Sequence, residues 1–228
     1  MSKSMIQGAT DKKIELCEEW FAQENEYNIV DVSFCAGQTI VQGKDDCRFA
    51  EFSSFLHAFM QKISTLFPFM TFIEKDFLHS TLLTIFNDND IAFNDNRFNL
   101  IKMCKEIAKD IYSYSPLTIY FNNIVLTSNG TIILLGESKE LIDFRNHVYN
   151  KYPIPQSLRK NIVHITLGRL FQNESIENMS ALNTFLKMKG SLSLPPLIIN
   201  HPKIIVSRDM LCLNVDNNLT CEFNRSAF

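Results

Sequence analysis

The sequence contains no long apolar run. Its N-terminal segment has no apolar stretch of signal-peptide length, and no later segment approaches the roughly 18 uninterrupted apolar residues that a membrane-spanning helix needs. Cys-x-x-Cys pairs are also absent, and several of the six scattered cysteines lie in apolar segments, where reduced cysteine behaves as a small hydrophobic residue. We therefore expect a cytoplasmic protein with no membrane span, disulfide framework or zinc site.

An excess of charge of either sign is lacking as well. The chain has 22 Lys and Arg residues against 25 Asp and Glu residues, a net charge of −3. This balance argues against a protein that coats long double-stranded nucleic acid by neutralising phosphates. A small nucleotide or one end of an RNA is still compatible with this charge as a partner.

Several cofactor motifs are missing too. The sequence has neither a phosphate-binding P-loop nor a nucleotidyl-lysine motif, which argues against an enzyme that joins substrates at the expense of ATP. The acidic run at Asp88 and Asp90 lacks the central glycine and spaced ligands of a calcium loop and is interpreted as a solvated loop. No cofactor and no metal ion are expected.

The composition that is present suits one large globular unit, since 46% of the 228 residues are hydrophobic. Apolar spacing predicts a helical extension within residues 1–26 and a helix over 49–67 whose phenylalanines from Phe52 to Phe59 are core. Further helices are expected over 97–112, 138–152 and 175–188. Strands are expected at 29–41, 77–86 and 161–170, at a hairpin around Asn129 and Gly130, and near the C-terminus.

One short pattern occurs twice. "FLHSTLLTIF" begins at Phe77 and "NIVHITLGRL" at Asn161, and each contains His-x-Thr-Leu. The other three histidines, His57, His147 and His201, lack it. Alternate side chains of a strand share a face, so each histidine projects together with the threonine two residues later. The apolar positions between and beside them predict that the opposite face of each strand packs under helices.

The two patterns together suit phosphodiester chemistry. If the strands meet in a cleft, a neutral imidazole of His79 or His164 can take a proton from water or a ribose hydroxyl, and the opposite imidazolium can protonate the departing oxygen. The hydroxyls of Thr81 and Thr166 can donate to non-bridging phosphate oxygens. The sequence does not assign the roles of acid and base.

These residues resemble the two-histidine phosphoesterase superfamily, which includes the LigT-like 2′-5′ RNA ligase and cyclic phosphodiesterase proteins. The resemblance rests on His79, Thr81, His164 and Thr166, and further on Arg169 in "HITLGR". It implies an α+β fold in which residues 1–228 form one bilobal, pseudo-twofold domain, with antiparallel sheets lining a central cleft and helices outside. It also implies metal-independent cleavage or formation of a 2′,3′-cyclic or 2′-5′ linked phosphodiester in a nucleotide or RNA terminus.

Other residues are weaker candidates. Arg159, Lys160 and Arg169 bracket the second motif and are predicted to bind substrate phosphates, although solvated basic residues are common at strand ends. A base could stack on one of three tyrosines, for which packing is the default interpretation: Tyr112, Tyr114 and Tyr120.

Two functions from other classes remain open. The chain could be a binding module that recognises a cyclic or oligomeric nucleotide without turning it over. Alternatively, the histidines could be structural and the chain a host- or phage-interaction protein. Burial of either imidazole against helices, away from a shared site, would favour this last interpretation.

Overall fold

A computed structural model of the chain describes residues 29–35, 47–73, 78–87, 102–103, 106–107, 109–110, 113–114, 117–170, 174–189, 194–199, 203–207 and 221–222. The predicted helix within residues 1–26 lies outside the described residues, as does Tyr112. Within the described part of the chain, no helix combines the length and apolarity required to cross a membrane.

The strands form two antiparallel sheets. The first sheet has the order β3-β1-β8-β9, formed by His79–Asn87, Ile29–Cys35, Lys203–Ser207 and Cys221–Glu222. The second sheet has the order β2-β6-β5-β4-β7, formed by Met70–Phe72, Val163–Leu170, Thr131–Glu137, Leu117–Leu126 and Leu197–Ile199. Each sheet therefore contains one of the two motif strands, β3 or β6. The short strands β2 and β7 were not expected from the sequence.

Three α-helices have described bounds: α3 (Cys47–Leu66), α5 (Lys139–Lys151) and α6 (Ile176–Met188). A single 3₁₀ turn, η3 (Gln156–Leu158), lies between α5 and β6. Serine hydroxyls cap two of the helices: Ser138 accepts from the Leu141 backbone N–H and Ser175 from that of Asn178. Such caps satisfy N–H groups that have no partner within the helix. The predicted boundaries of α5 and α6 are confirmed within two residues.

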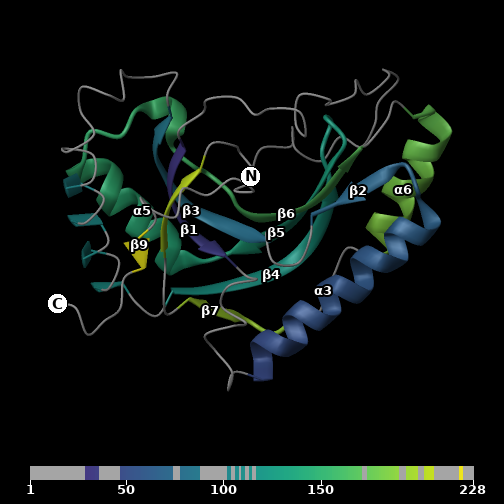
Figure 1. Cartoon of the computed structure of the whole chain (residues 1–228), viewed down its shortest axis with the longest axis horizontal. Coiled ribbons are helices and arrows are strands. Elements are labelled where there is room, and N and C mark those ends of the chain that lie inside the picture. Colours follow the sequence, from purple (N-terminus) through teal and green to yellow (C-terminus); the bar gives the residue numbers. More distant parts are fainter. Residues whose placement is uncertain are drawn as a thin grey trace.

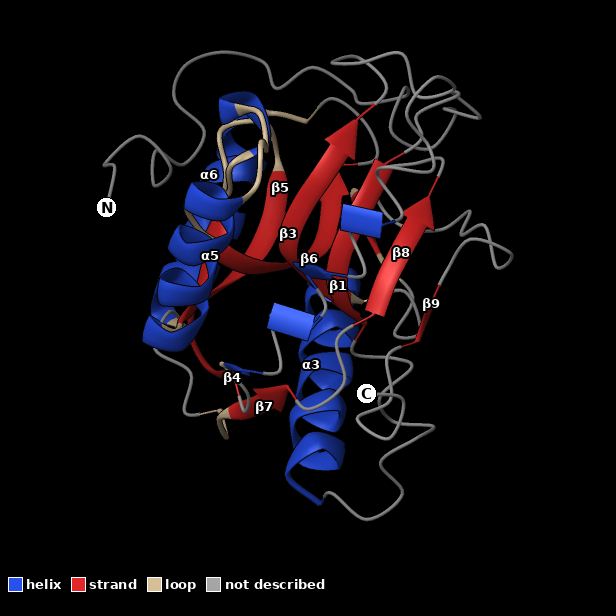
Figure 2. Cartoon of the chain, turned by 90° about the vertical axis from the view of Figure 1, so that its left-hand side faces the viewer, coloured by secondary structure: helices blue, strands red, loops and turns tan. Residues whose placement is uncertain are grey.

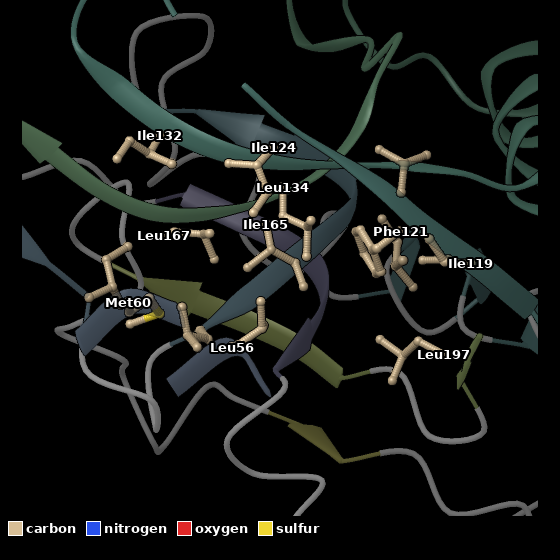
Figure 3. Packing of buried hydrophobic residues seen from close by; sticks show 14 of the residues in the cluster. Leu56, Met60, Ile119, Phe121, Ile124, Ile132, Leu134, Ile165, Leu167 and Leu197 are labelled. Carbon is tan, nitrogen blue, oxygen red and sulfur yellow. The ribbon is translucent and has the colours of Figure 1, made fainter. Parts of the chain in front are cut away.

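The core contains side chains of the helices, of one face of the second sheet and of strand β3. Figure 1 shows β4, β5 and β6 as long, curved strands with α3 and α6 along one side. Figure 3 shows apolar side chains from α3 gathered with those from β4, β5 and β6. Leu56, Ile63, Leu134 and Ile165 are all at most 1% exposed. Burial of this apolar face is the main force that holds the helices on the sheet.

The prediction that every phenylalanine between Phe52 and Phe59 is core was wrong for one residue. Phe55 is 39% exposed and stacks on Phe59 with ring centroids 6.2 Å apart. At 100° per residue, Phe55 lies at the edge of the apolar arc of α3, where one side of its ring meets solvent. The remaining members of the arc are buried as predicted.

The hairpin between β4 and β5 is confirmed. Gly130 has φ = 76°, in the left-handed region that glycine adopts at little cost, and its N–H donates to the Thr127 carbonyl. The architecture is therefore α+β, with curved antiparallel sheets and helices on the outside of the second one.

Candidate functional site

Strand β6 carries the second motif on its half-buried face. Val163, Ile165 and Leu167 are at most 3% exposed, whereas His164 and Thr166 are half-buried. The alternation predicted from the sequence is therefore confirmed on this strand. In the ladder, His164 lies opposite Leu135 of β5 and Thr166 opposite Ile133, so these four side chains share one face of the second sheet.

Strand β3 repeats the arrangement at the edge of the first sheet. Leu78, Ser80 and Leu82 are at most 3% exposed, and His79 and Thr81 are half-buried. Both motif histidines thus keep part of their surface in contact with solvent.

A β-bulge places Arg169 with the second motif. The register of β5 against β6 shifts at Leu167, so that Thr166 pairs with Ile133 and Arg169 pairs with Thr131. Simple alternation from Thr166 would point Arg169 to the opposite face, but the extra residue at the bulge restores it to the face of His164 and Thr166. Arg169 is 9% exposed and lies between Thr71 of β2 and Thr131 of β5.

The two motif strands lie next to each other although they belong to different sheets (Figure 2). Their histidines are close enough for the charge of His79 to lower the pKa of His164. The structure therefore brings together the two histidines that the sequence places 85 residues apart.

A residue that sequence reasoning missed joins the two strands. Arg145 of α5 is 2% exposed and donates from Nε to the Leu82 carbonyl at 2.8 Å and from Nη2 to the Thr81 carbonyl at 3.2 Å. Its Nη1 donates to the carbonyl of Ile162, two residues before His164, at 2.8 Å. One guanidinium thus hydrogen-bonds to the backbone of both motif segments.

A signal for Arg145 was present in the sequence. Leu141, Phe144 and Val148 define the inward arc of α5, and position 145 falls on the same arc at helical spacing. A charged residue in the apolar arc of an amphipathic helix is rarely buried without polar partners. Its three carbonyl partners lie on distant segments, however, and only the fold identifies them.

The electrostatic setting of His164 favours its neutral form. Burial is the largest cause, followed by the positive charges of Lys160, His79 and Arg145, and together they lower the pKa of His164 from 6.5 to about 4. Burial also lowers the pKa of Arg145 from 12.5 to about 10, which leaves its guanidinium charged at neutral pH. His164 can therefore accept a proton at neutral pH.

The other two predicted basic residues occupy different settings. Arg159 is exposed, donates to the carbonyls of Ile154 and Tyr149, and lies 5.2 Å from the centroid of the Tyr149 ring. Lys160 is half-buried, and its backbone N–H donates to the Tyr149 hydroxyl at 2.8 Å. Of the two, Lys160 is the one whose charge acts on His164.

The described tyrosines also differ. Tyr114 packs on Phe144 and His147, with ring centroids 5.5 and 5.6 Å away, as expected for a packing residue. Tyr120 of β4 is 57% exposed. It pairs with Glu137, and the register through Asn123 and Leu135 puts it on the face that carries His164.

No protein-family model matches the chain, and no curated protein matches it. Among solved structures, the chain is similar to ATU0111, a conserved protein of unknown function from Agrobacterium tumefaciens, with 10% identity, a TM-score of 0.50 and 81% coverage of each chain. TT0787 of Thermus thermophilus aligns over 78% of this chain and 86% of its own, with 12% identity and a TM-score of 0.39. The similarity to ATU0111 concerns the fold alone.

Proposed function

We propose that this chain is a metal-independent phosphodiesterase that acts on a 2′,3′-cyclic or 2′-5′ linked phosphodiester of a nucleotide or RNA terminus. The observation that carries the proposal is the meeting of the two His-x-Thr strands, whose histidines interact electrostatically although they come from different sheets. A matched acid and base on opposite sides of one phosphate is what cleavage of a phosphodiester requires.

In the proposed reaction His164 is the base. Its pKa of about 4 keeps it neutral at pH 7, and a bound phosphodiester anion would raise that pKa toward the range where an imidazole is an effective base. His164 takes a proton from water as the water oxygen bonds to phosphorus. His79, as the imidazolium, gives its proton to the ribose oxygen as the P–O bond breaks. Exchange with solvent then restores both protonation states.

The hydroxyls and cations of the site are assigned to the phosphate. Thr81 and Thr166 share a strand face with their histidines and would donate to the non-bridging oxygens, on which charge builds in the transition state. Lys160 lies close enough to His164 to affect its pKa, so its positive charge is available to the same phosphate. Arg169 adds a second cation on the face of His164 and Thr166.

The proposal is tested by turnover in the presence of EDTA. The substrates are 2′,3′-cyclic nucleotides, 2′-5′ and 3′-5′ dinucleotides and cyclic oligonucleotides, given to the wild type and to His79→Ala and His164→Ala. We expect at least one substrate to be cleaved in EDTA and each substitution to lower the rate at least about a hundredfold, the scale of losing general acid or base help. His57→Ala is the matched control, since His57 is exposed on α3 and bonds to Gln61.

Two results would contradict the proposal. Activity that EDTA abolishes would require a metal that the proposed mechanism does not use. Tight binding of a nucleotide without turnover, retained in His164→Ala, would favour the nucleotide-binding module instead.

A further inference from the structure

Among the described residues, no acidic side chain forms an ion pair with the buried guanidinium of Arg145. The ion pairs found there involve other cations. Its neighbours in the helix arc, Leu141, Phe144 and Val148, are fully buried apolar side chains. Removing a charge from water is expensive, and an apolar side chain of similar length at this position would avoid that expense. What Arg145 supplies at this position, and a leucine or methionine would not, is therefore a set of hydrogen-bond donors in addition to packing.

The three acceptors of Arg145 have one property in common, because they belong to the backbone of the two motif segments. Two of them, the carbonyls of Thr81 and Leu82, lie on the edge strand β3. The ladder between β3 and β1 is irregular there, since Val32 pairs with Leu83 and Ser33 with Thr81, which leaves Leu82 as the extra residue of a bulge. Arg145 thus satisfies carbonyls at an irregular strand edge.

The third acceptor is the Ile162 carbonyl, at the entry to β6. Strands β3 and β6 belong to different sheets, so no ladder among the described strands holds them in register. A planar guanidinium fixes the directions as well as the distances of its acceptors, because its donors lie in one rigid fork. A lysine ammonium offers no such fork.

We propose that Arg145 is a positioning residue that holds the two His-x-Thr motifs at the separation and orientation needed for acid–base catalysis. Its effect on turnover rests on the proposed function, whereas its effect on the two histidines does not. The charge of Arg145 acts on His164 in addition to its hydrogen bonds, since it is one of the positive charges that lower the pKa of that imidazole. The same side chain thus contributes to both the placement and the protonation of the base.

Two substitutions separate these contributions. Arg145→Met removes the donors and the charge while keeping an extended side chain, and Arg145→Lys keeps the charge but loses the planar fork. Lys151→Met is the control, because Lys151 is a cation on the same helix that bonds to Asp110, away from the motif strands. The measurements are kcat and KM on the substrate identified above, and the pKa values of the His164 and His79 imidazoles from NMR titration.

We expect Arg145→Met to lower kcat at least about a hundredfold while KM changes less than about threefold, since misplacement of catalytic groups by about 1 Å has effects of this size. The pKa of His164 is expected to rise in this variant. Arg145→Lys should retain the low pKa of His164 but lose most of kcat. The control should match the wild type in every measurement.

The proposal is overturned if Arg145→Met, folded by circular dichroism, keeps wild-type kcat and an unchanged His164 pKa, because Arg145 would then only stabilise the fold. If Arg145→Met does not fold, Arg145→Lys decides the question. A wild-type kcat in Arg145→Lys would show that catalysis does not need the planar guanidinium. If the wild type cleaves no substrate, the proposed function fails by itself. In that case NMR of Arg145→Lys, which keeps the charge, decides the role of Arg145: changed imidazole chemical shifts of both His79 and His164 support positioning, and unchanged shifts contradict it.

Discussion

Acid is expected to destabilise the folded chain through His164. The pKa of this imidazole is lowered from 6.5 to about 4 in the folded protein, chiefly by burial. Between these two values the unfolded chain binds a proton at His164 that the folded chain does not bind. Stability is therefore unaffected by this residue above pH 6.5 and falls as the pH drops toward 4.

The size of the effect follows from the two pKa values. Between pH 7.5 and pH 4.5, His164 is expected to lower the free energy of unfolding by roughly 2–3 kcal/mol, given about 1.36 kcal/mol for each pH unit over which the folded and unfolded chains differ by one proton. This is a large share of the roughly 5–15 kcal/mol by which domains are stable. It should be visible in urea denaturation at the two pH values.

His164→Gln isolates this contribution, since glutamine retains polar atoms but does not titrate. We expect the variant to lose roughly 2–3 kcal/mol less stability than the wild type on going from pH 7.5 to pH 4.5. Groups that do not interact with His164 titrate equally in both chains and cancel in the comparison. His57→Gln, which removes an exposed histidine of α3, is the control for the loss of a histidine elsewhere. Parallel losses in the wild type and His164→Gln would refute the assigned setting of His164.

Two further predictions concern other parts of the fold. Gly168→Ala should lower the free energy of unfolding by about 1–3 kcal/mol, and by more than Gly136→Ala does. The added Cβ at position 168 would lie 2.5 Å from the Thr71 backbone oxygen, whereas a Cβ at position 136 would meet side chains, which can move. Urea denaturation of both variants ranks them, and the reverse order would contradict the assigned packing of β2 on β6. Burial raises the pKa of Asp110, but hydrogen bonds from Lys151 and neighbouring residues outweigh it and leave that pKa below 3.8. Asp110→Asn should therefore lower the melting temperature at pH 7. The difference in melting temperature from the wild type should shrink as the pH falls below 3.8 and the carboxylate is protonated. An equal difference at pH 7 and below pH 3.8 would show that the charge of Asp110 is not involved.

Local features of the fold were predictable because they depend on residues close in sequence. The hairpin follows from Gly130, which accommodates φ = 76°. Helix α5 follows from its serine cap and the spacing of Leu141, Phe144 and Val148. The faces of β3 and β6 follow from strand alternation around His79 and His164.

Features that depend on distant residues could not be predicted. The short strand β2 exists because Met70–Phe72 pairs with β6, about 100 residues later, and its three residues carry no pattern of their own. The bulge at Leu167 returns Arg169 to the face of the motif, contrary to simple alternation. The role of Arg145 depends on carbonyls, which every residue possesses and which leave no trace in the sequence.

The central claim is that the two His-x-Thr motifs form a single site. The most direct test is NMR of the imidazole nitrogens of His79 and His164 during titration with adenosine 2′-monophosphate, a phosphate-bearing product of the proposed reaction. We predict that both imidazoles respond along one binding curve with a single Kd, and that His57 does not respond. A response from only one of the two histidines, or from both with different Kd values, would contradict a shared site.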